Sequence, residues 1–151
     1  LPQGDVKPRQ FAGYTVFRSG IHVATDADKP FMLALAKECY PKRPVENGVA
    51  WVEWCMRNPE RLVLVGAYSF GICRVETLYG FERRSGMDML CARKGAGFEA
   101  FHMLRRMLQW ARAKGAQGVF KLDADTGADF EPFARRLGGR VSPVRFYEIP
   151  L

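Results

Sequence analysis

The sequence lacks any hydrophobic run near the ~20 residues that a membrane-spanning helix needs. Its most apolar stretch, residues 62–68, has the length and the β-branched content of a buried strand. The first ten residues contain no apolar segment of the kind found in secretory signals. From these absences we expect a soluble protein of the cytoplasm.

Residues that bind metals or form disulfides are also few. The chain contains two histidines and four cysteines, namely His22, His102, Cys39, Cys55, Cys73 and Cys91. The cysteines are far apart and form no C-x-x-C pair, whereas zinc sites are typically built from closely spaced cysteines and histidines. Each cysteine falls in an apolar pattern, where a free cysteine usually packs as a small buried side chain. The sequence therefore favours neither a metal site, nor a disulfide framework, nor a cysteine nucleophile.

The overall composition is that of an ordinary globular protein. Of 151 residues, 48% are hydrophobic and 26% are charged, which is enough to build a core without metal or disulfide cross-links. We predict one domain over residues 21–151, preceded by an arm, residues 1–20, for which no packed structure is predicted. The formal net charge of +7 favours an acidic partner, such as a polyphosphate cofactor or nucleic acid.

Hydrophobic periodicity predicts an alternation of strands and helices. One helix is expected to begin after residue 28 and to end at about residue 39. Further helices are expected over 45–57, 98–115 and 127–137. Strands are expected over 21–24, 61–68, 71–78, from Met87 onward, and over 118–124 and 144–149. The short link between the second and third strands predicts an antiparallel pair. This order indicates an α/β (α+β) fold with three layers.

The most informative segment lies between the strand at Met87 and the long helix that follows. Gly95 and Gly97 allow a close backbone approach, and the helix start adds unpaired N–H groups and the positive end of its dipole. Arg93 and Lys94 add positive charge at the same place. Such a turn can bind a phosphate, although an ordinary strand-to-helix turn would have the same sequence.

The order of elements over residues 21–151 resembles the GCN5-related N-acetyltransferase (GNAT) superfamily. Residues 92–97, Ala-Arg-Lys-Gly-Ala-Gly, are similar to its acetyl-CoA pyrophosphate loop, and residues 108–116 and 133–139 are similar to two later family segments. The short motifs also resemble small acetyltransferase-like proteins of bacteriophages. The resemblance implies a three-layer acyl-CoA N-acyltransferase-like fold with a mixed, mostly antiparallel sheet flanked by helices.

Two positions depart from the family pattern. The first loop position, usually Gln or Arg, is Ala92 unless the register shifts by one residue to Arg93. The tyrosine that often protonates the departing thiolate aligns with Ala134, so Tyr147 in the last predicted strand is the candidate to replace it.

The resemblance further implies that acetyl-CoA is the co-substrate and lies between the strand at Met87 and the strand at 118–124. Its pantetheine arm would pair with the backbone at residues 90–92, and its diphosphate would meet the amides at 94–97. The residues implied to bind it are Leu90, Cys91, Ala92, Arg93, Lys94, Gly95, Ala96, Gly97 and Thr126. Thr126 has the alternative role of helping to start the next helix.

In the implied reaction the acceptor amine must lose a proton, and a general base would assist this step. Glu76 and Asp88, on the central strands, are the main candidates, and Asp123 and Asp125 are further ones. For Glu76 the alternative is a simple ion pair with Arg74, its same-face neighbour two residues away. Trp51 and Trp54 lie on the predicted helix that borders the acceptor site in this fold.

These observations predict an acetyl-CoA-dependent N-acyltransferase acting on an amine of a small molecule or a protein. Two alternatives keep the same fold. One is a catalytically silent binding or structural protein, for instance a phage virion or host-interaction protein. The other is an enzyme that modifies nucleobases, which the positive net charge would suit.

Overall fold

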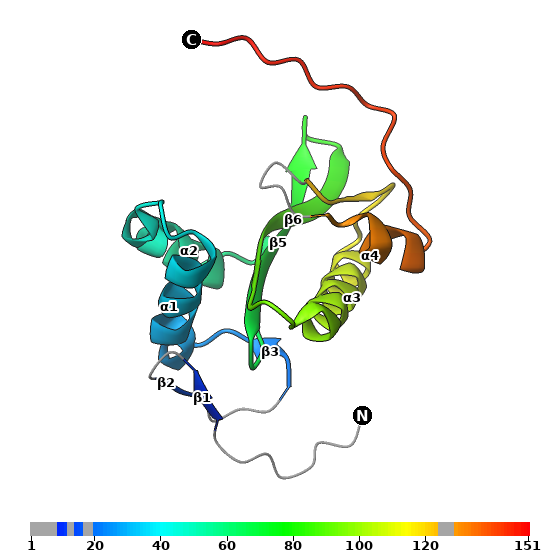
Figure 1. The fold of residues 1–151 in the computed structure, drawn as a ribbon. Coiled ribbons are helices and arrows are strands. Elements are labelled where there is room, and N and C mark those ends of the chain that lie inside the picture. The colour runs from blue at the N-terminus through cyan, green and yellow to red at the C-terminus, as the bar shows by residue number, and fades with distance from the viewer. Residues whose placement is uncertain (1–8, 12–13, 17–19, 124–128) are drawn as a thin grey trace.

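The computed structural model describes residues 9–11, 14–16, 20–123 and 129–151. Near the N-terminus, β1 (Arg9–Phe11) and β2 (Tyr14–Val16) form an antiparallel two-stranded sheet that lies beside the first helix (Figure 1). Among the described residues, no helix is both long and apolar enough to cross a bilayer.

A five-stranded sheet forms the centre of the molecule. Its strands are β3 (His22–Val23), β4 (Arg61–Val65), β5 (Ser69–Leu78), β6 (Glu82–Ala92) and β7 (Phe120–Lys121). They lie in sequence order, and every neighbouring pair is antiparallel except β6 and β7, which run parallel. The mixed, mostly antiparallel sheet is therefore as predicted.

Helices cover both faces of this sheet (Figure 1). The helices are α1 (Lys29–Cys39) and α2 (Val49–Arg57) on one face, and α3 (Gly97–Ala113) and α4 (Glu131–Arg136) on the other. Short 3₁₀ turns, η1 (Asp26–Asp28) and η2 (Val45–Gly48), lead into α1 and α2. The three-layer α/β arrangement that the sequence predicted is confirmed.

Each face of the sheet has its own apolar core. On the α3 face, Met103, Leu104 and Met107 recur at helical spacing and pack against Cys73, and none of the four is more than 1% exposed. On the opposite face, Leu35 of α1 packs with residues of α2 and of the central strands. Cys55, Cys73 and Cys91 are all buried, as their apolar surroundings predicted.

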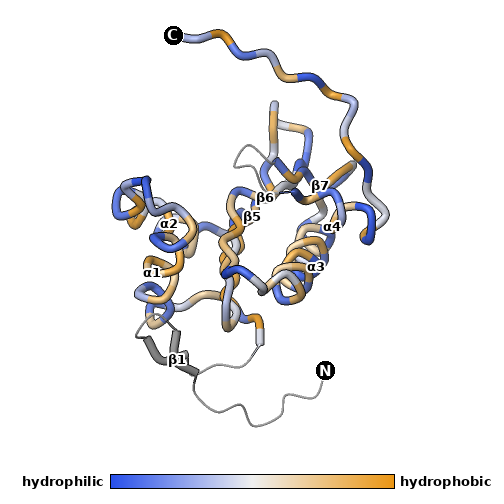
Figure 2. Tube along the Cα trace, in the orientation of Figure 1, coloured by the Kyte–Doolittle hydropathy of each residue, from blue (hydrophilic) through white to orange (hydrophobic). Residues whose placement is uncertain are grey.

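The strand predicted over 118–124 is reduced to the two residues of β7 in the described structure, and two further strand predictions differ more. The β5–β6 turn is tighter than expected because Tyr79 and Gly80 adopt left-handed backbone angles, φ 54° and 79°, so β6 begins at Glu82 and not at Met87. The strand predicted over 144–149 is wrong, because that segment has no strand partner in the described structure. It runs away from the body of the protein with alternating hydrophobic and hydrophilic residues (Figure 2).

Candidate functional site

The loop from β6 to α3 is a tight turn closed by backbone hydrogen bonds. The Arg93 N–H donates to the Tyr68 carbonyl at 2.9 Å and the Ala96 N–H donates to the Arg93 carbonyl at 2.9 Å. Gly95 has φ +90°, an angle that only glycine adopts readily. The turn therefore depends on the glycine that the motif places at this position.

The start of α3 provides backbone donors next to this turn. The N–H groups of the first helical turn of α3 have no acceptor within the helix, and α3 begins at Gly97. A Cβ atom added at Gly95 or at Gly97 would meet no atom within 4 Å, so the space in front of both residues is open. Lys94 is exposed beside them, and Arg93 pairs with Glu38 through Nε and Oε1 at 3.2 Å. The amides of this turn are therefore candidate donors for an anion.

Among the described residues, no strand lies beside the edge of β6 that leads to this turn. β7 pairs with β6 only at Ser85 and Gly86, whereas β6 continues to Ala92. From Met87 to Ala92, the described structure pairs β6 with β5 alone. Half of the backbone groups along such an edge point away from the existing sheet and can bind an extended ligand.

A β-bulge in β6 turns Asp88 toward the α1 and α2 face. Ile72 of β5 pairs with Met89, but the next residue, Cys73, pairs with Met87, so Asp88 is the extra residue of β6. Met87 then packs into the core on the α3 face, while Met89 packs on the opposite face. A bulge re-aims a side chain in this way, and here it brings Asp88 beside Arg74.

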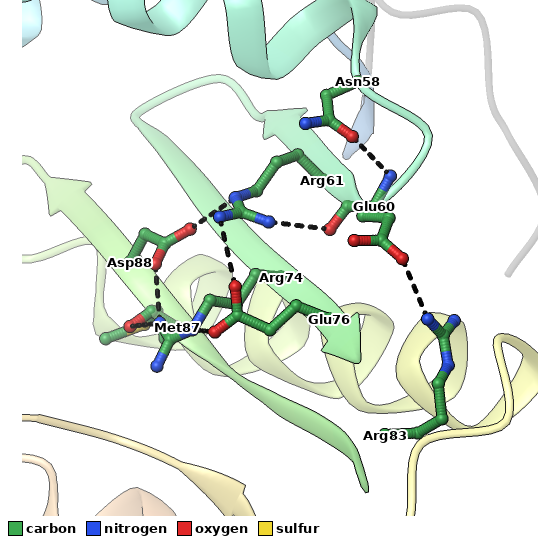
Figure 3. A network of polar contacts seen from close by, with 8 residues as sticks. All are labelled: Asn58, Glu60, Arg61, Arg74, Glu76, Arg83, Met87 and Asp88. Carbon is green, nitrogen blue, oxygen red and sulfur yellow. Dashed lines mark hydrogen bonds and ion pairs between the residues drawn. The ribbon is translucent and has the colours of Figure 1, made fainter. Parts of the chain in front are cut away.

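Asp88 and Glu76 belong to one network with two arginines (Figure 3). Arg74 contacts Asp88 Oδ1 at 2.6 Å and Glu76 Oε1 at 3.4 Å, which confirms the predicted Arg74–Glu76 pair. Arg61 of β4 contacts Asp88 Oδ2 at 3.3 Å and Glu76 Oε2 at 3.7 Å. The Asp88 side chain is 16% exposed and that of Glu76 is 31% exposed. Trp54 lies over the Arg61 guanidinium, 5.3 Å from ring centre to Cζ.

A cavity of about 240 Å³ lies on the same face of the sheet, between α1, α2 and the strands. Phe70 of β5 and Met89 of β6 line it, together with Met32 of α1 and Trp51 of α2. Because Met89 follows Asp88 directly, the cavity and the network are neighbours on β6. Of the two tryptophans of α2, Trp51 lines the cavity and Trp54 contacts Arg61 of the network.

Glu99, in the first turn of α3, fixes the β4–β5 turn next to the loop. Its carboxylate accepts hydrogen bonds from Ala67 N at 3.1 Å, Tyr68 N at 2.8 Å and Ser69 Oγ at 2.5 Å. A side chain at Gly66 would collide with this carboxylate. Sequence reasoning missed Glu99, and its only signal was an acidic residue in the first turn of the long helix.

Cys39 and Cys91 meet close to the end of β6. The Cys39 Sγ lies 3.6 Å from the Ala92 carbonyl oxygen. A hydrogen bond from the Cys91 thiol lowers the pKa of Cys39 to about 7, and the same contact raises the pKa of Cys91. Burial raises the pKa of Cys55 to about 11 and that of Cys73 to about 12.

The structure brings some of the predicted site residues together and separates others. Residues 90–97 form one continuous edge and turn, and Glu76 lies beside Asp88. Tyr147 is 85% exposed on the C-terminal segment that leads away from the sheet, so it is not brought to the two carboxylates. Thr126 and Asp125 lie outside the described residues, and Asp123 is exposed.

No protein-family model matches the sequence, and no curated protein matches it either. Solved structures do match the fold. Aminoglycoside 6'-N-acetyltransferase AAC(6')-Ig from Acinetobacter haemolyticus superposes with a TM-score of 0.67 and 14% identity, covering 87% of this chain and 99% of its own. A putative acetyltransferase from Agrobacterium tumefaciens gives a TM-score of 0.66, 13% identity, and coverage of 87% and 99%.

A third match has a ligand related to the predicted co-substrate. Aminoglycoside acetyltransferase AAC(6')-Iy, solved in complex with the bisubstrate analogue CoA-S-monomethyl-acetylneamine, matches with a TM-score of 0.65 and 14% identity, covering 87% of this chain and 97% of its own. At these identities the likeness concerns the fold. The chain therefore has the fold of the GNAT acetyltransferases, as its sequence predicted.

Proposed function

We propose that this protein is an acetyl-CoA-dependent N-acetyltransferase. The observation that carries the proposal is the edge of β6 from Met87 to Ala92, which pairs with no second strand in the described structure and leads directly to an open glycine turn at the start of α3. A strand edge that continues into a turn with backbone donors suits a ligand that has an extended amide arm followed by a diphosphate. Acetyl-CoA has both parts, and CoA is named in the ligand of one matching structure.

The residues present fit this co-substrate. The backbone of residues 90–92 would bind the pantetheine arm as an added strand, and the amides of Lys94, Gly95 and Gly97 would bind the diphosphate. The Ala96 N–H already donates within the turn, so it is left out of this set. The positive charge of Lys94 would strengthen binding of the diphosphate, and high salt would weaken this contribution.

When bound, acetyl-CoA would supply a thioester: a neutral amine forms a C–N bond to the acetyl carbon, the C–S bond breaks, and CoA leaves as a thiol with a proton lost from the amine nitrogen. The acceptor amine must lose a proton, and Asp88 is the side chain we assign to take it. Its carboxylate has about four lone-pair sites, and its contacts to Arg61 and Arg74 leave room for a further partner. Glu76 of β5 is the second candidate, because it contacts the same two arginines on the same face of the sheet.

Binding of the co-substrate is tested at Gly97. Replacing Gly97 by Asp should leave the helix intact, because an acidic residue suits the first turn of a helix and its Cβ meets no atom. The new carboxylate would repel the diphosphate. We expect the Kd for acetyl-CoA, measured by calorimetry, to rise at least tenfold in Gly97→Asp and far less in the uncharged control Gly97→Asn. Equal affinities, or no binding to the unmodified protein, would contradict the proposal.

Catalysis is tested at the two carboxylates. A general base typically contributes ~10² to 10⁴-fold to the rate. We therefore expect Asp88→Asn to lower kcat by that factor while the acetyl-CoA affinity is retained, and Glu76→Gln to lower it less than about tenfold. The reverse order would assign the base to Glu76.

A catalytically silent protein of the same fold is the second candidate. The observation that favours it is Ala134, at the position where the family often has its tyrosine acid, within α4. Tight acetyl-CoA binding without acetyl transfer to any amine would support this alternative. Release of free CoA thiol in the presence of an amine would exclude it.

A further inference from the structure

We propose that the cavity between α1 and α2 binds the acceptor, and that this acceptor is a small primary amine with a single positive charge and an aromatic or branched apolar body. The inference rests on the proposed acetyl transfer and names the substrate class of that reaction.

The lining of the cavity is apolar. Met32 of α1, Val52 of α2, and Phe70 and Met89 of the strands all line it, and Trp51 adds an aromatic surface. Methionine and aromatic side chains make favourable contacts with aromatic groups. A ligand that fills this space must therefore present a hydrocarbon surface to it.

The charged groups at the cavity do not suit a polycation. They are Lys29, Arg43 and Glu53. Glu53 already binds Lys29, whose Nζ lies 3.2 Å from Glu53 Oε1 and 3.0 Å from Asp26 Oδ1. Arg43 is exposed and adds positive charge. No carboxylate of the described lining is left to hold a second ammonium group, so an acceptor with several amines is disfavoured.

The cavity is placed between solvent and the proposed acetyl position. Val49 and Trp51, on its α2 side, are 36% and 38% exposed, so the acceptor can enter from outside while the co-substrate occupies the β6 edge. Met89 also lines the cavity, and in the sequence of β6 it lies between Asp88 and Leu90. An amine that reaches Met89 is therefore close to both the proposed acetyl group and the proposed base.

The volume sets the size of the acceptor. At about 240 Å³, the cavity falls just below the ~300–1,000 Å³ common for ligand pockets. It suits one ring or a branched chain. Long acceptors would extend past the rim into solvent.

Binding can be tested without acetyl-CoA by NMR of the protein labelled at its methionine methyl groups. Of the six methionines, Met32 and Met89 line the cavity, whereas Met103 and Met107 are fully buried on the other face of the sheet. We expect 2-phenylethylamine to shift the Met32 and Met89 signals and to leave those of Met103 and Met107 unchanged. Spermidine and ethanolamine should shift none of the four.

A filled cavity provides the matched variant. Ala36→Phe places a ring inside the cavity, whereas Ala50→Phe adds the same ring at an exposed α2 position outside it. We expect Ala36→Phe to abolish the shifts and to raise KM for 2-phenylethylamine at least tenfold, with the Kd for acetyl-CoA unchanged within about twofold. Ala50→Phe should behave like the unmodified protein.

The outcomes separate this inference from the proposed function. Methionine shifts without any acetyl-CoA binding would contradict the proposed function and leave the cavity assignment standing. Acetyl-CoA binding with spermidine as a better substrate than 2-phenylethylamine would overturn the acceptor class. The cavity could instead hold a long acyl chain of the co-substrate. In that case transfer to ethanolamine would be faster from hexanoyl-CoA than from acetyl-CoA, and this result would also overturn the acceptor class.

Discussion

The two faces of the central sheet are built differently. On the α3 face, Met103, Leu104 and Met107 close over Cys73 with at most 1% exposure. On the α1 and α2 face, an equally buried core around Leu35 gives way to a cavity and then to the ion pairs of Asp88 and Glu76 with two arginines. The core of the α3 face is closed by apolar packing, with the Glu99–Ser69 hydrogen bond near the start of the helix, whereas the other face keeps several charged groups and open space beside the β6 edge.

This difference indicates how stability and chemistry are divided. A closed apolar core stabilises the fold without the free-energy penalty of burying charge. Arg61, Arg74, Glu76 and Asp88 are partly buried charges, and such groups contribute little net stability compared with apolar packing. Substitutions on the two faces should therefore have different effects.

The largest effect is expected from the α3 face. Leu104→Ala removes a side chain that is 1% exposed, and such deletions destabilise proteins by about 2–5 kcal/mol. Phe98→Ala, on the same helix but 79% exposed, should change the free energy of unfolding by less than about 0.5 kcal/mol. Urea unfolding monitored by circular dichroism measures both. Similar losses in the two variants would refute the contrast between a closed core and an exposed surface.

Glu99 should have the next largest effect, because it connects α3 to the β4–β5 turn. In Glu99→Gln one carboxylate oxygen becomes an amide nitrogen that faces backbone donors. Hydrogen bonds to charged groups contribute about 1.5–3 kcal/mol, so we expect a loss of that order in urea unfolding. The control Glu131→Gln breaks only an exposed pair with Arg135 and should lose under about 0.5 kcal/mol.

The alkylation rates of Cys39 and Cys73 allow a direct comparison of the two faces. With a pKa of about 7, Cys39 becomes a thiolate as the pH rises through 7, so its alkylation by iodoacetamide should increase between pH 6 and 8 and then level off. Cys73, on the closed face, has a pKa of about 12 and is fully buried, and it should stay unmodified in the folded protein.

Removing the Cys91 thiol is the matched test of this difference. Cys91→Ala deletes the hydrogen bond that lowers the pKa of Cys39, so that pKa should rise toward its ordinary value of 9.0. Because a weaker acid gives a more nucleophilic thiolate, the rate at pH 7 should fall only about five- to tenfold. Mass spectrometry of the alkylated peptides measures it. An unchanged midpoint would mean that the two thiols do not interact.

The smallest effect is expected from the C-terminal segment, which belongs to neither face. Tyr147 is 85% exposed there, so Tyr147→Phe should change the acetyl-transfer rate less than about twofold. A loss comparable to that of Asp88→Asn, measured by thiol release, would show that the segment folds back onto the site when substrates bind.

Local features of the site could be predicted because they depend on residues close in sequence. Gly95 is required by a backbone angle of +90°, and the Arg74–Glu76 pair follows from strand alternation over two residues. The apolar stripe of α3 is visible at helical spacing. The prediction of a strand over 144–149 was wrong because it depends on residues far away in the sequence. An alternating pattern forms a strand only where a neighbouring strand accepts its hydrogen bonds.

The sequence by itself determined the order of elements, the glycine turn and the apolar faces, because each depends on spacing within one segment. Only the tertiary structure decided that a bulge turns Asp88 toward Arg61, a residue 27 positions earlier on another strand. It also decided that Glu99 binds the β4–β5 turn and that α1 and α2 leave a cavity over Met89. These features depend on strand register and helix packing, which join residues far apart in the chain.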